Sequence, residues 1–207
     1  MTEHATAPTS SPDAGTDPLA RLRAATAQLH AELDAGLPLA RDRAGPRDYQ
    51  QHLALLRTWV GLLRDGGARL ALLDEEAVAL DAELAECERV TGRRAPVVAM
   101  PAAAQPALQA DGADWGLAYV LQGSRLGGQV LYKRLAQAMA PLRLGYLQGA
   151  GGATGARWKA FVAQLKTELA DQPARTEAAV QAARQAFELL LACHRAMDGG
   201  TVAPARH

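Results

Sequence analysis

Apolar residues recur along most of the chain at intervals of three and four residues, the spacing that places side chains on one face of a helix. The first such stripe runs from Leu19 to Leu33 and follows an Asp17-Pro18 pair. An aspartate before a proline is a common helix start, because the carboxylate accepts a hydrogen bond from a free backbone amide and proline has no amide to leave unpaired. We therefore predict a helix from Pro18 to about Gly36.

Further stretches with the same period are separated by glycines and prolines, which commonly end helices. The segment 93–112 carries three prolines, and we expect it to cross the molecule with at most a short helical turn. Since no segment shows the two-residue period of a strand, the pattern predicts an all-α, irregular helical bundle. The expected helices cover residues 46–66, 74–92, 113–139, 154–170 and 173–197.

Composition supports a helical domain flanked by two tails. Aromatic residues make up only 4% of the sequence, whereas alanine and leucine, which favour helices, are abundant. A chain of 207 residues is long enough for one domain with a substantial core. Residues 1–16 are rich in Ser, Thr, Pro and Ala and show no apolar period. We expect a disordered tail there, a helical domain over 17–197 and a flexible tail over 198–207.

Charge and cysteine content exclude several classes of function. The 22 basic and 22 acidic residues cancel, so the chain has no overall field to hold nucleic acid or an anionic membrane. No run of about 18 apolar residues appears and the N-terminus lacks an export signal, so we expect a cytoplasmic protein. Cys87 and Cys193 lie far apart in predicted helices, which favours two reduced, buried thiols over a metal site.

Three glycines interrupt the helix predicted between the proline-rich segment and the last two helices. Gly123, Gly127 and Gly128 together cost about 2–3 kcal/mol of helix stability relative to alanine. Gly123 and Gly127 are four residues apart and leave bare backbone on one face, and Gly128 allows a kink. Either another helix packs tightly against this face or a flat ligand lies on it. The polar neighbours Ser124 and Arg125 favour the ligand, because a plain helix contact would prefer alanine there.

One histidine has the surroundings of a metal ligand. His30 borders the apolar stripe of the first helix, and Asp34 follows one turn later, where it can accept a hydrogen bond from one ring nitrogen. Such a bond fixes the ring and leaves the other nitrogen as a neutral ligand, although a purely structural histidine stays open on these observations. Arg23 lies on a similar face and could meet an anionic group. His52 and His194 are expected at the surface or the edge of the core.

These motifs, taken together, resemble the heme oxygenase family, in particular its bacterial branch. The stretch LRAATAQLHAELD contains His30, and YVLQGSRLGGQVLYK contains the glycines. Residues 153–161, ATGARWKAF, resemble a third segment of that family, and the likeness extends over about 18–196. The resemblance implies a single helical domain that holds heme between a proximal and a distal helix.

The resemblance also implies roles for individual residues. His30 would be the proximal iron ligand and Asp34 its orienting partner, while Gly123, Gly127 and Gly128 would face the iron from the distal helix. Polar groups that would hold water for proton delivery are Gln122, Ser124 and Arg125. Cations that would pair with the heme propionates are Arg23, Lys133 and Lys159.

The implied activity is oxidative cleavage of heme, which is both substrate and cofactor, to biliverdin, carbon monoxide and ferrous iron. It uses O2 and electrons from an external donor such as a ferredoxin or a flavin reductase, and a bilin-binding photoreceptor could use the product. The mammalian branch has an aspartate where this chain has Ser124, which leaves the proton route open. Two alternatives remain on the sequence alone: a heme-binding carrier or sensor with the same fold, and a helical protein that binds no heme or works on another small ligand.

Overall fold

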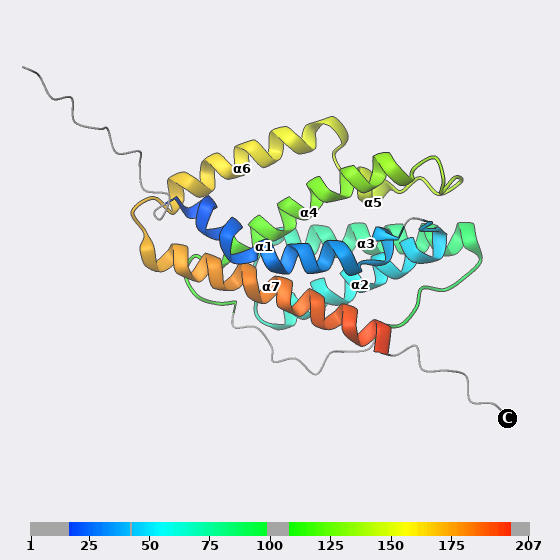
Figure 1. Ribbon diagram of the computed structural model, residues 1–207, viewed down its shortest axis with the longest axis horizontal. Coiled ribbons are helices and arrows are strands. Elements are labelled where there is room, and N and C mark those ends of the chain that lie inside the picture. The colour runs from blue at the N-terminus through cyan, green and yellow to red at the C-terminus, as the bar shows by residue number, and fades with distance from the viewer. Residues whose placement is uncertain (1–16, 42, 99–107, 200–207) are drawn as a thin grey trace, which may run out of the picture.

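The computed structural model describes residues 17–41, 43–98 and 108–199, and these residues form helices without any strand (Figure 1). The predicted all-α fold is therefore confirmed. The predicted tail over 1–16 and nearly all of the one over 198–207 lie outside the described residues. The helices are α1 (Pro18–Gly36), α2 (Pro46–Asp65), α3 (Ala71–Thr91), α4 (Ala113–Leu135), α5 (Gly145–Gln148), α6 (Thr154–Glu168) and α7 (Pro173–Gly199), with short 3-10 helices η1 (Pro38–Ala40) and η2 (Gly151–Ala153).

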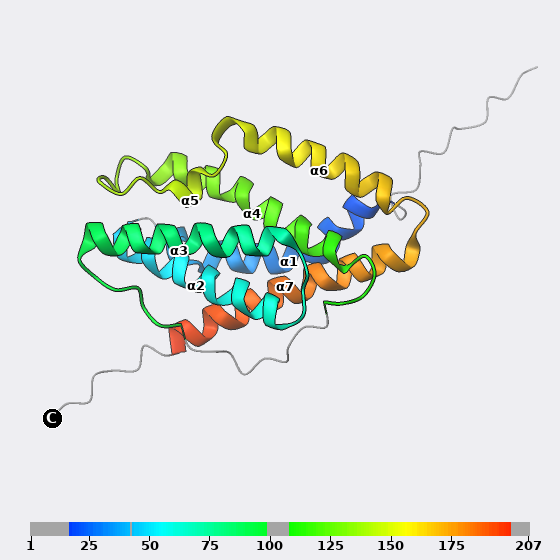
Figure 2. The ribbon, with the colours of Figure 1, turned by 180° about the vertical axis from the view of Figure 1, so that it is seen from behind.

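Helix α7 is the central partner in the packing, since α1, α2 and α4 all pack against it. Helix α3 lies on the other side of α2, as the rear view shows, and α6 covers parts of α1 and α4 (Figure 2). Leucine and alanine side chains fill the space between these helices. The indole Nε1 of Trp59 in α2 donates a hydrogen bond of 2.8 Å to the carbonyl oxygen of Ala186, which ties α2 to α7.

Helix α1 begins and ends where its sequence predicts. The Asp17 side chain accepts a hydrogen bond of 3.2 Å from the Leu19 amide, and Pro18 occupies the first helical position. Its buried residues include Leu22 and Leu33. The helix ends at Gly36. Because its buried residues lie on one face, the opposite side of α1 is exposed.

Several boundaries differ from the sequence-based expectations. Helix α3 begins at Ala71, ahead of the acidic run in which the start was expected, and α4 ends at Leu135 rather than near residue 139. Helix α5 was not expected, because four residues are too few to show a period. The expectation of a helix broken at its glycines is wrong, since residues 113–135 are helical throughout.

Helices α4 and α7 approach each other closely at the N-terminal half of α4. A Cβ added to Gly116 would lie 1.9 Å from the carbonyl oxygen of Ala179 in α7, a distance that no side chain tolerates. Gly112, just before α4, has a φ of +94°, and a Cβ there would lie 2.5 Å from the carbonyl oxygen of Arg175. Close packing against α7 therefore explains why glycine occupies these two positions, which the sequence analysis did not predict to be packing positions.

Both cysteines are buried and free, as predicted. Burial raises the pKa of Cys87 to about 12 and that of Cys193 to about 11, so neither thiol ionises near neutral pH. Among the described residues, no helix combines the length and the apolar character needed to cross a membrane.

Candidate functional site

The exposed backbone predicted at the glycines is present in the second half of α4. Among the described residues, a Cβ added to Gly127 would meet no atom within 4 Å, and one added to Gly123 would meet only the Trp158 ring, 3.9 Å away. Gly127 lies about three turns beyond Gly116 on the same side of the helix. The side of α4 that packs tightly on α7 near its start is thus uncovered farther along.

The third glycine has a different environment. A Cβ added to Gly128 would lie 3.4 Å from the carbonyl oxygen of Leu147 in α5. Gly128 is therefore a close-packing position, and it does not share the open surroundings of Gly127. The three glycines that the sequence grouped together consequently divide into two open positions and one that packs on α5.

Aromatic side chains flank the open backbone on one side. Trp158 of α6 lies beside Gly123, and its ring centroid is 5.8 Å from that of Tyr119 in α4 and 5.7 Å from that of Phe161. These rings join α4 to α6. Tyr119 and Trp158 lie within the quoted stretches YVLQGSRLGGQVLYK and ATGARWKAF, but sequence reasoning assigned no role to either ring.

His30 and its predicted partner are in contact. The His30 Nδ1 lies 2.9 Å from Asp34 Oδ2, one turn along α1. The histidine side chain is 60% exposed, and its ring centroid is 5.8 Å from that of Phe187 in α7. Within the described residues, Nε2 of His30 has no hydrogen-bond partner. The imidazole is thus oriented at one nitrogen and accessible at the other.

Helices α1 and α4 are connected mainly through other elements. They run in the same general direction, and α4 rises away from α1 toward its C-terminal end (Figure 1). Both pack on α7 and α6. Near their C-terminal ends, a guanidinium nitrogen of Arg134 in α4 donates to the carbonyl oxygen of Leu39 in η1, directly after α1. His30 and Gly127 thus lie on two helices that share α6 and α7 as packing partners and are connected by one hydrogen bond near their C-terminal ends.

The polar residues next to Gly123 point in different directions. The Ser124 hydroxyl donates a hydrogen bond of 2.8 Å to the Leu121 carbonyl oxygen, and the residue is exposed. Arg125 is two residues before Gly127, so its side chain leaves α4 on nearly the opposite side. It does not join Ser124 at the uncovered backbone.

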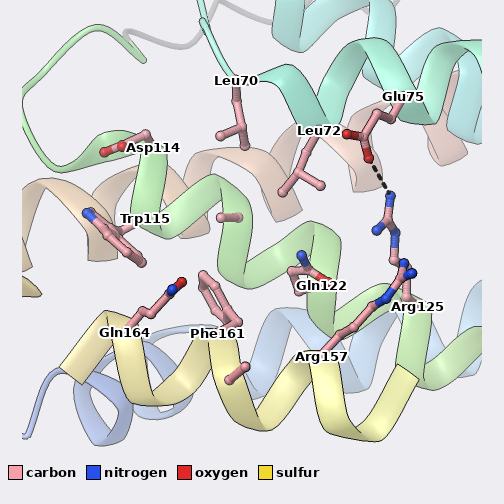
Figure 3. Close-up of a pocket in the computed structure, with 12 residues that line it drawn as sticks. Leu70, Leu72, Glu75, Asp114, Trp115, Gln122, Arg125, Arg157, Phe161 and Gln164 are labelled. Carbon is pink, nitrogen blue, oxygen red and sulfur yellow. Dashed lines mark ion pairs between the residues drawn. The ribbon is translucent and has the colours of Figure 1, made fainter. Parts of the chain in front are cut away.

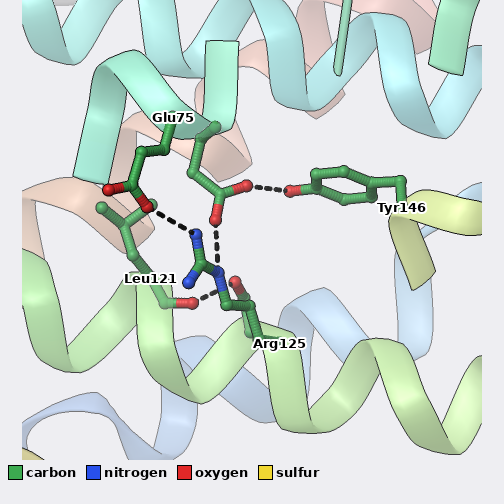
Figure 4. A network of polar contacts seen from close by, with 6 residues as sticks. Glu75, Leu121, Arg125 and Tyr146 are labelled. Carbon is green, nitrogen blue, oxygen red and sulfur yellow. Dashed lines mark hydrogen bonds and ion pairs between the residues drawn. The ribbon is translucent and has the colours of Figure 1, made fainter. Parts of the chain in front are cut away.

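Arg125 instead belongs to a buried polar network with α3 and α5 (Figure 4). Its Nε donates to Glu76 Oε1 at 2.6 Å, and the Tyr146 hydroxyl donates to Glu76 Oε2 at 2.7 Å. A second guanidinium nitrogen lies 3.8 Å from Glu75 Oε2. Glu76 is only 2% exposed. Burial, followed by the charge of Glu76, raises the pKa of Tyr146 well above its usual value, so its hydroxyl stays protonated and keeps donating.

The predicted propionate partners are all accessible. Arg23 of α1, Lys133 in the last turn of α4 and Lys159 of α6 are exposed, and none of them has an ion-pair partner in the described part of the chain. They come from three different helices, and no contact joins them. Each is therefore free to meet an anion, but the protein alone does not gather them.

A family comparison links this arrangement to known proteins. The model of the family described as Heme oxygenase matches residues 83–196, which is more than half of the chain. The chain belongs to the heme oxygenase family. The matched segment contains α4 with its glycines, α6 and most of α7, whereas His30 lies outside it. No curated protein and no solved structure matched the chain in the corresponding comparisons.

Membership in the heme oxygenase family implies heme binding and suggests a heme-degrading enzyme. The residues that would meet heme come from two parts of this chain. The glycines are within the matched segment, and the candidate iron ligand is contributed by α1, ahead of it.

A cavity of about 480 Å³ lies between the start of α3, α4 and α6 (Figure 3). Trp115 and Phe161 form part of its apolar wall, and Gln122, Arg125 and Arg157 are at its polar end. In this member of the heme oxygenase family, therefore, Gln122 lines the same cavity as Arg125 rather than the uncovered side of α4. Of the three polar residues expected to hold water for proton delivery, Gln122 and Arg125 line this cavity, whereas Ser124 is not among its lining residues.

Two other histidines occupy positions that the sequence did not distinguish. His52 is only 5% exposed in the core, its Nδ1 has no hydrogen-bond partner among the described residues, and burial lowers its pKa to about 4. The expectation that His52 lies at the surface or the core edge is therefore wrong. His194 is half-buried, with Nε2 2.7 Å from the Gly36 carbonyl oxygen at the end of α1.

Proposed function

We propose that this protein is a heme oxygenase of the bacterial branch that cleaves heme to biliverdin, carbon monoxide and ferrous iron. One observation carries the proposal: the backbone at Gly127 is bare and open, within the segment that matches the family. The side chain that glycine lacks would fill the space that a flat ligand needs. An oriented, accessible imidazole at His30 of α1 supports the same conclusion.

The residues present fit heme as a ligand. His30 would bind the iron through Nε2, because a hydrogen bond from Nδ1 to Asp34 fixes the ring orientation and the tautomer that leaves Nε2 free. When bound, heme supplies the iron at which O2 is reduced and the ring that is opened. A histidine ligand suits this reaction, since the stronger electron donation of a thiolate would favour O–O cleavage.

The protein's own side chains would control access and orientation around the ligand. Phe187 lies against the His30 ring and would limit its rotation. Trp158 and Tyr119 would exclude bulk water from the side of the open backbone next to Gly123. The exposed cations Arg23, Lys133 and Lys159 would pair with the two propionates.

Ser124 would take part in proton delivery. Its hydroxyl proton is donated to the Leu121 carbonyl, so the oxygen retains lone pairs that can accept a hydrogen bond from an ordered water. Such a water could carry a proton to the reacting oxygen in place of the aspartate-held water of the mammalian branch. Arg125 has no direct part in this route, because Glu76 and Glu75 hold its guanidinium on another side of α4.

The physiological setting follows from the same proposal. A cytoplasmic enzyme of this type would receive its electrons from a ferredoxin or a flavin reductase. Its biliverdin could serve as the chromophore of a bilin-binding photoreceptor, or the reaction could serve to release iron.

A single-turnover assay tests the function. Purified protein is mixed with hemin, and ascorbate, or a ferredoxin with its reductase, is added in air. We expect loss of the Soret band and formation of biliverdin, with carbon monoxide captured by added ferrous myoglobin. Recovery of unchanged, bound hemin with a working donor would favour a carrier or sensor, and failure to bind hemin would exclude both functions.

A further inference from the structure

On the open side of α4, no described residue lies within 4 Å of a Cβ placed on Gly127, so contacts on this side do not fix where the backbone lies. A ligand that meets bare backbone depends on its position to within a fraction of an ångström. The position of residues 123–128 must therefore be set by contacts on the other sides of α4. The polar network around Glu76 is on one of those sides.

We propose that Glu76, Arg125 and Tyr146 are positioning residues that hold this segment of α4 in place for heme. Glu76 of α3 accepts one hydrogen bond at each carboxylate oxygen, from Arg125 of α4 and from Tyr146 of α5. Three helices thus meet at one carboxylate (Figure 4). The inference rests on the proposed function, since it assigns the network its purpose at the heme site.

The chemistry of the network suits a positioning role better than an apolar contact would. Leucine and alanine side chains can slide past one another at little cost, whereas hydrogen bonds weaken steeply with misalignment. Glu76 is buried, so a displaced partner would leave its charge without compensation. The segment can therefore move only if several bonds break together.

A second attachment lies immediately after the open backbone. The side-chain amide of Gln129 donates to the carbonyl oxygen of Gly151 in η2, and Gly128 approaches the backbone of Leu147 in α5. Tyr146, which bonds to Glu76, is the residue before Leu147. Helix α5 and the 3-10 helix η2 after it therefore contact α4 at two adjacent points, next to the bond between Tyr146 and Glu76.

Hydrogen exchange without heme tests the positioning role. In Glu76→Gln, which keeps the shape of the side chain but removes its charge, we expect amides of residues 123–129 to exchange about tenfold faster, with α7 unchanged. The matched control is Asp81→Asn, which removes the carboxylate of another ion pair on α3, 2.6 Å from Arg57 Nε on α2. It should leave exchange in residues 123–129 as it is.

Tyr146→Phe is the second variant, because it removes only one hydrogen bond and leaves the buried ion pair intact. It should also accelerate exchange in residues 123–129, to a smaller extent. On addition of hemin, both variants should shift or broaden the Soret band relative to Asp81→Asn, which a purely global loss of stability in a folded protein would not do.

Two results would overturn the inference: unchanged exchange in residues 123–129, or equal acceleration in every helix. If Glu76→Gln does not fold, Tyr146→Phe decides the question by the same criteria. Failure of the unaltered protein to bind hemin would instead count against the proposed function. The two failures are distinguishable, because the exchange measurement needs no heme.

Discussion

At the scale of single residues, His30 shows how far local sequence can predict a site. Its contact with Asp34 follows from helix periodicity alone, because residues four apart lie on one face. The ring contact with Phe187 of α7 could not be predicted, since it depends on how two distant helices pack. The exposure of the imidazole likewise depends on how α1 packs against other helices, so it could not be predicted from the local sequence.

Replacement of His30 by alanine tests its role as iron ligand. Hemin bound to His30→Ala should lose the spectrum of a histidine complex and form no biliverdin, because the substitution removes the proposed iron ligand. Added imidazole should restore part of the spectrum. Gln28→Ala, an exposed change on the same helix, is the control. An unaltered spectrum in His30→Ala would mean that the ligand is elsewhere.

Replacement of Asp34 by asparagine should weaken the site without removing it. The amide cannot accept the His30 proton as strongly, so the ring loses orientation and basicity. We expect hemin affinity or the rate of biliverdin formation to fall by about 10- to 100-fold. Titration with hemin and a single-turnover rate measure this. If Asp34→Asn matched the unaltered protein in both, the orienting role would be wrong.

At the scale of elements, the glycines in the two halves of α4 have different surroundings. Its N-terminal half requires a glycine for contact with α7, and its second half has glycines with free space beside them. Sequence spacing predicted bare backbone at Gly123 and Gly127, and the structure agrees. It could not separate packing glycines from open ones, because that distinction depends on the neighbouring helix.

A pair of alanine substitutions tests this division. Gly127→Ala should stabilise the heme-free protein by about 0.8–1 kcal/mol, since the methyl group meets nothing and alanine favours the helix. That corresponds to a rise in Tm of about 2–4 °C. The same variant should form biliverdin more slowly, because the methyl group occupies ligand space.

Gly116→Ala is the matched change and should destabilise the protein strongly, because its Cβ would collide with the Ala179 carbonyl. Urea unfolding of both variants gives the comparison. Equal effects of the two substitutions would show that α4 is not divided in this way.

The elements that sequence reasoning missed share a physical cause. Helix α5 is too short to show a period, and its importance comes from Tyr146, which bonds to a residue distant in sequence. Glu76 belongs to an acidic run that is typical of a solvated helix start. Glu76 is buried where Arg125 of α4 and Tyr146 of α5 contact it, and no local sequence pattern predicts these contacts.

At the scale of the whole molecule, the long helices were predictable and their mutual arrangement was not. Helix α1 packs its buried apolar residues against α7, and two polar contacts add to this attachment: Lys166 of α6 bonds to Asp17 at 3.0 Å, and Arg195 of α7 bonds to Glu32 at 2.7 Å. The segment that identifies the family begins after α1. The contacts of α1 with α6 and α7 therefore hold the candidate iron ligand, His30, against the matched segment.

The buried His52 should make the stability of the whole molecule depend on pH. Its pKa is about 4 in the folded protein, below the ordinary value of 6.5, so the unfolded chain binds more protons between these values. Stability due to this group is fully present above pH 6.5 and is lost on acidification to pH 4, by about 3 kcal/mol.

Urea unfolding at pH 6.5 and pH 4.5 measures this loss for the unaltered protein and for His52→Leu, so that other titrating groups cancel. The variant should lose distinctly less stability over this interval. Identical pH dependence in the two proteins would contradict burial of a neutral His52.

The burial of Cys87 and Cys193 has a practical consequence. Thiol reagents attack the ionised sulfur, and the raised pKa values keep both sulfurs protonated as well as covered. We therefore expect the unaltered protein not to react with maleimide dyes. A cysteine introduced at Val130, which is 69% exposed on α4, would be labelled selectively. A fluorophore there would be quenched as hemin arrives, giving a direct optical record of how fast the site fills.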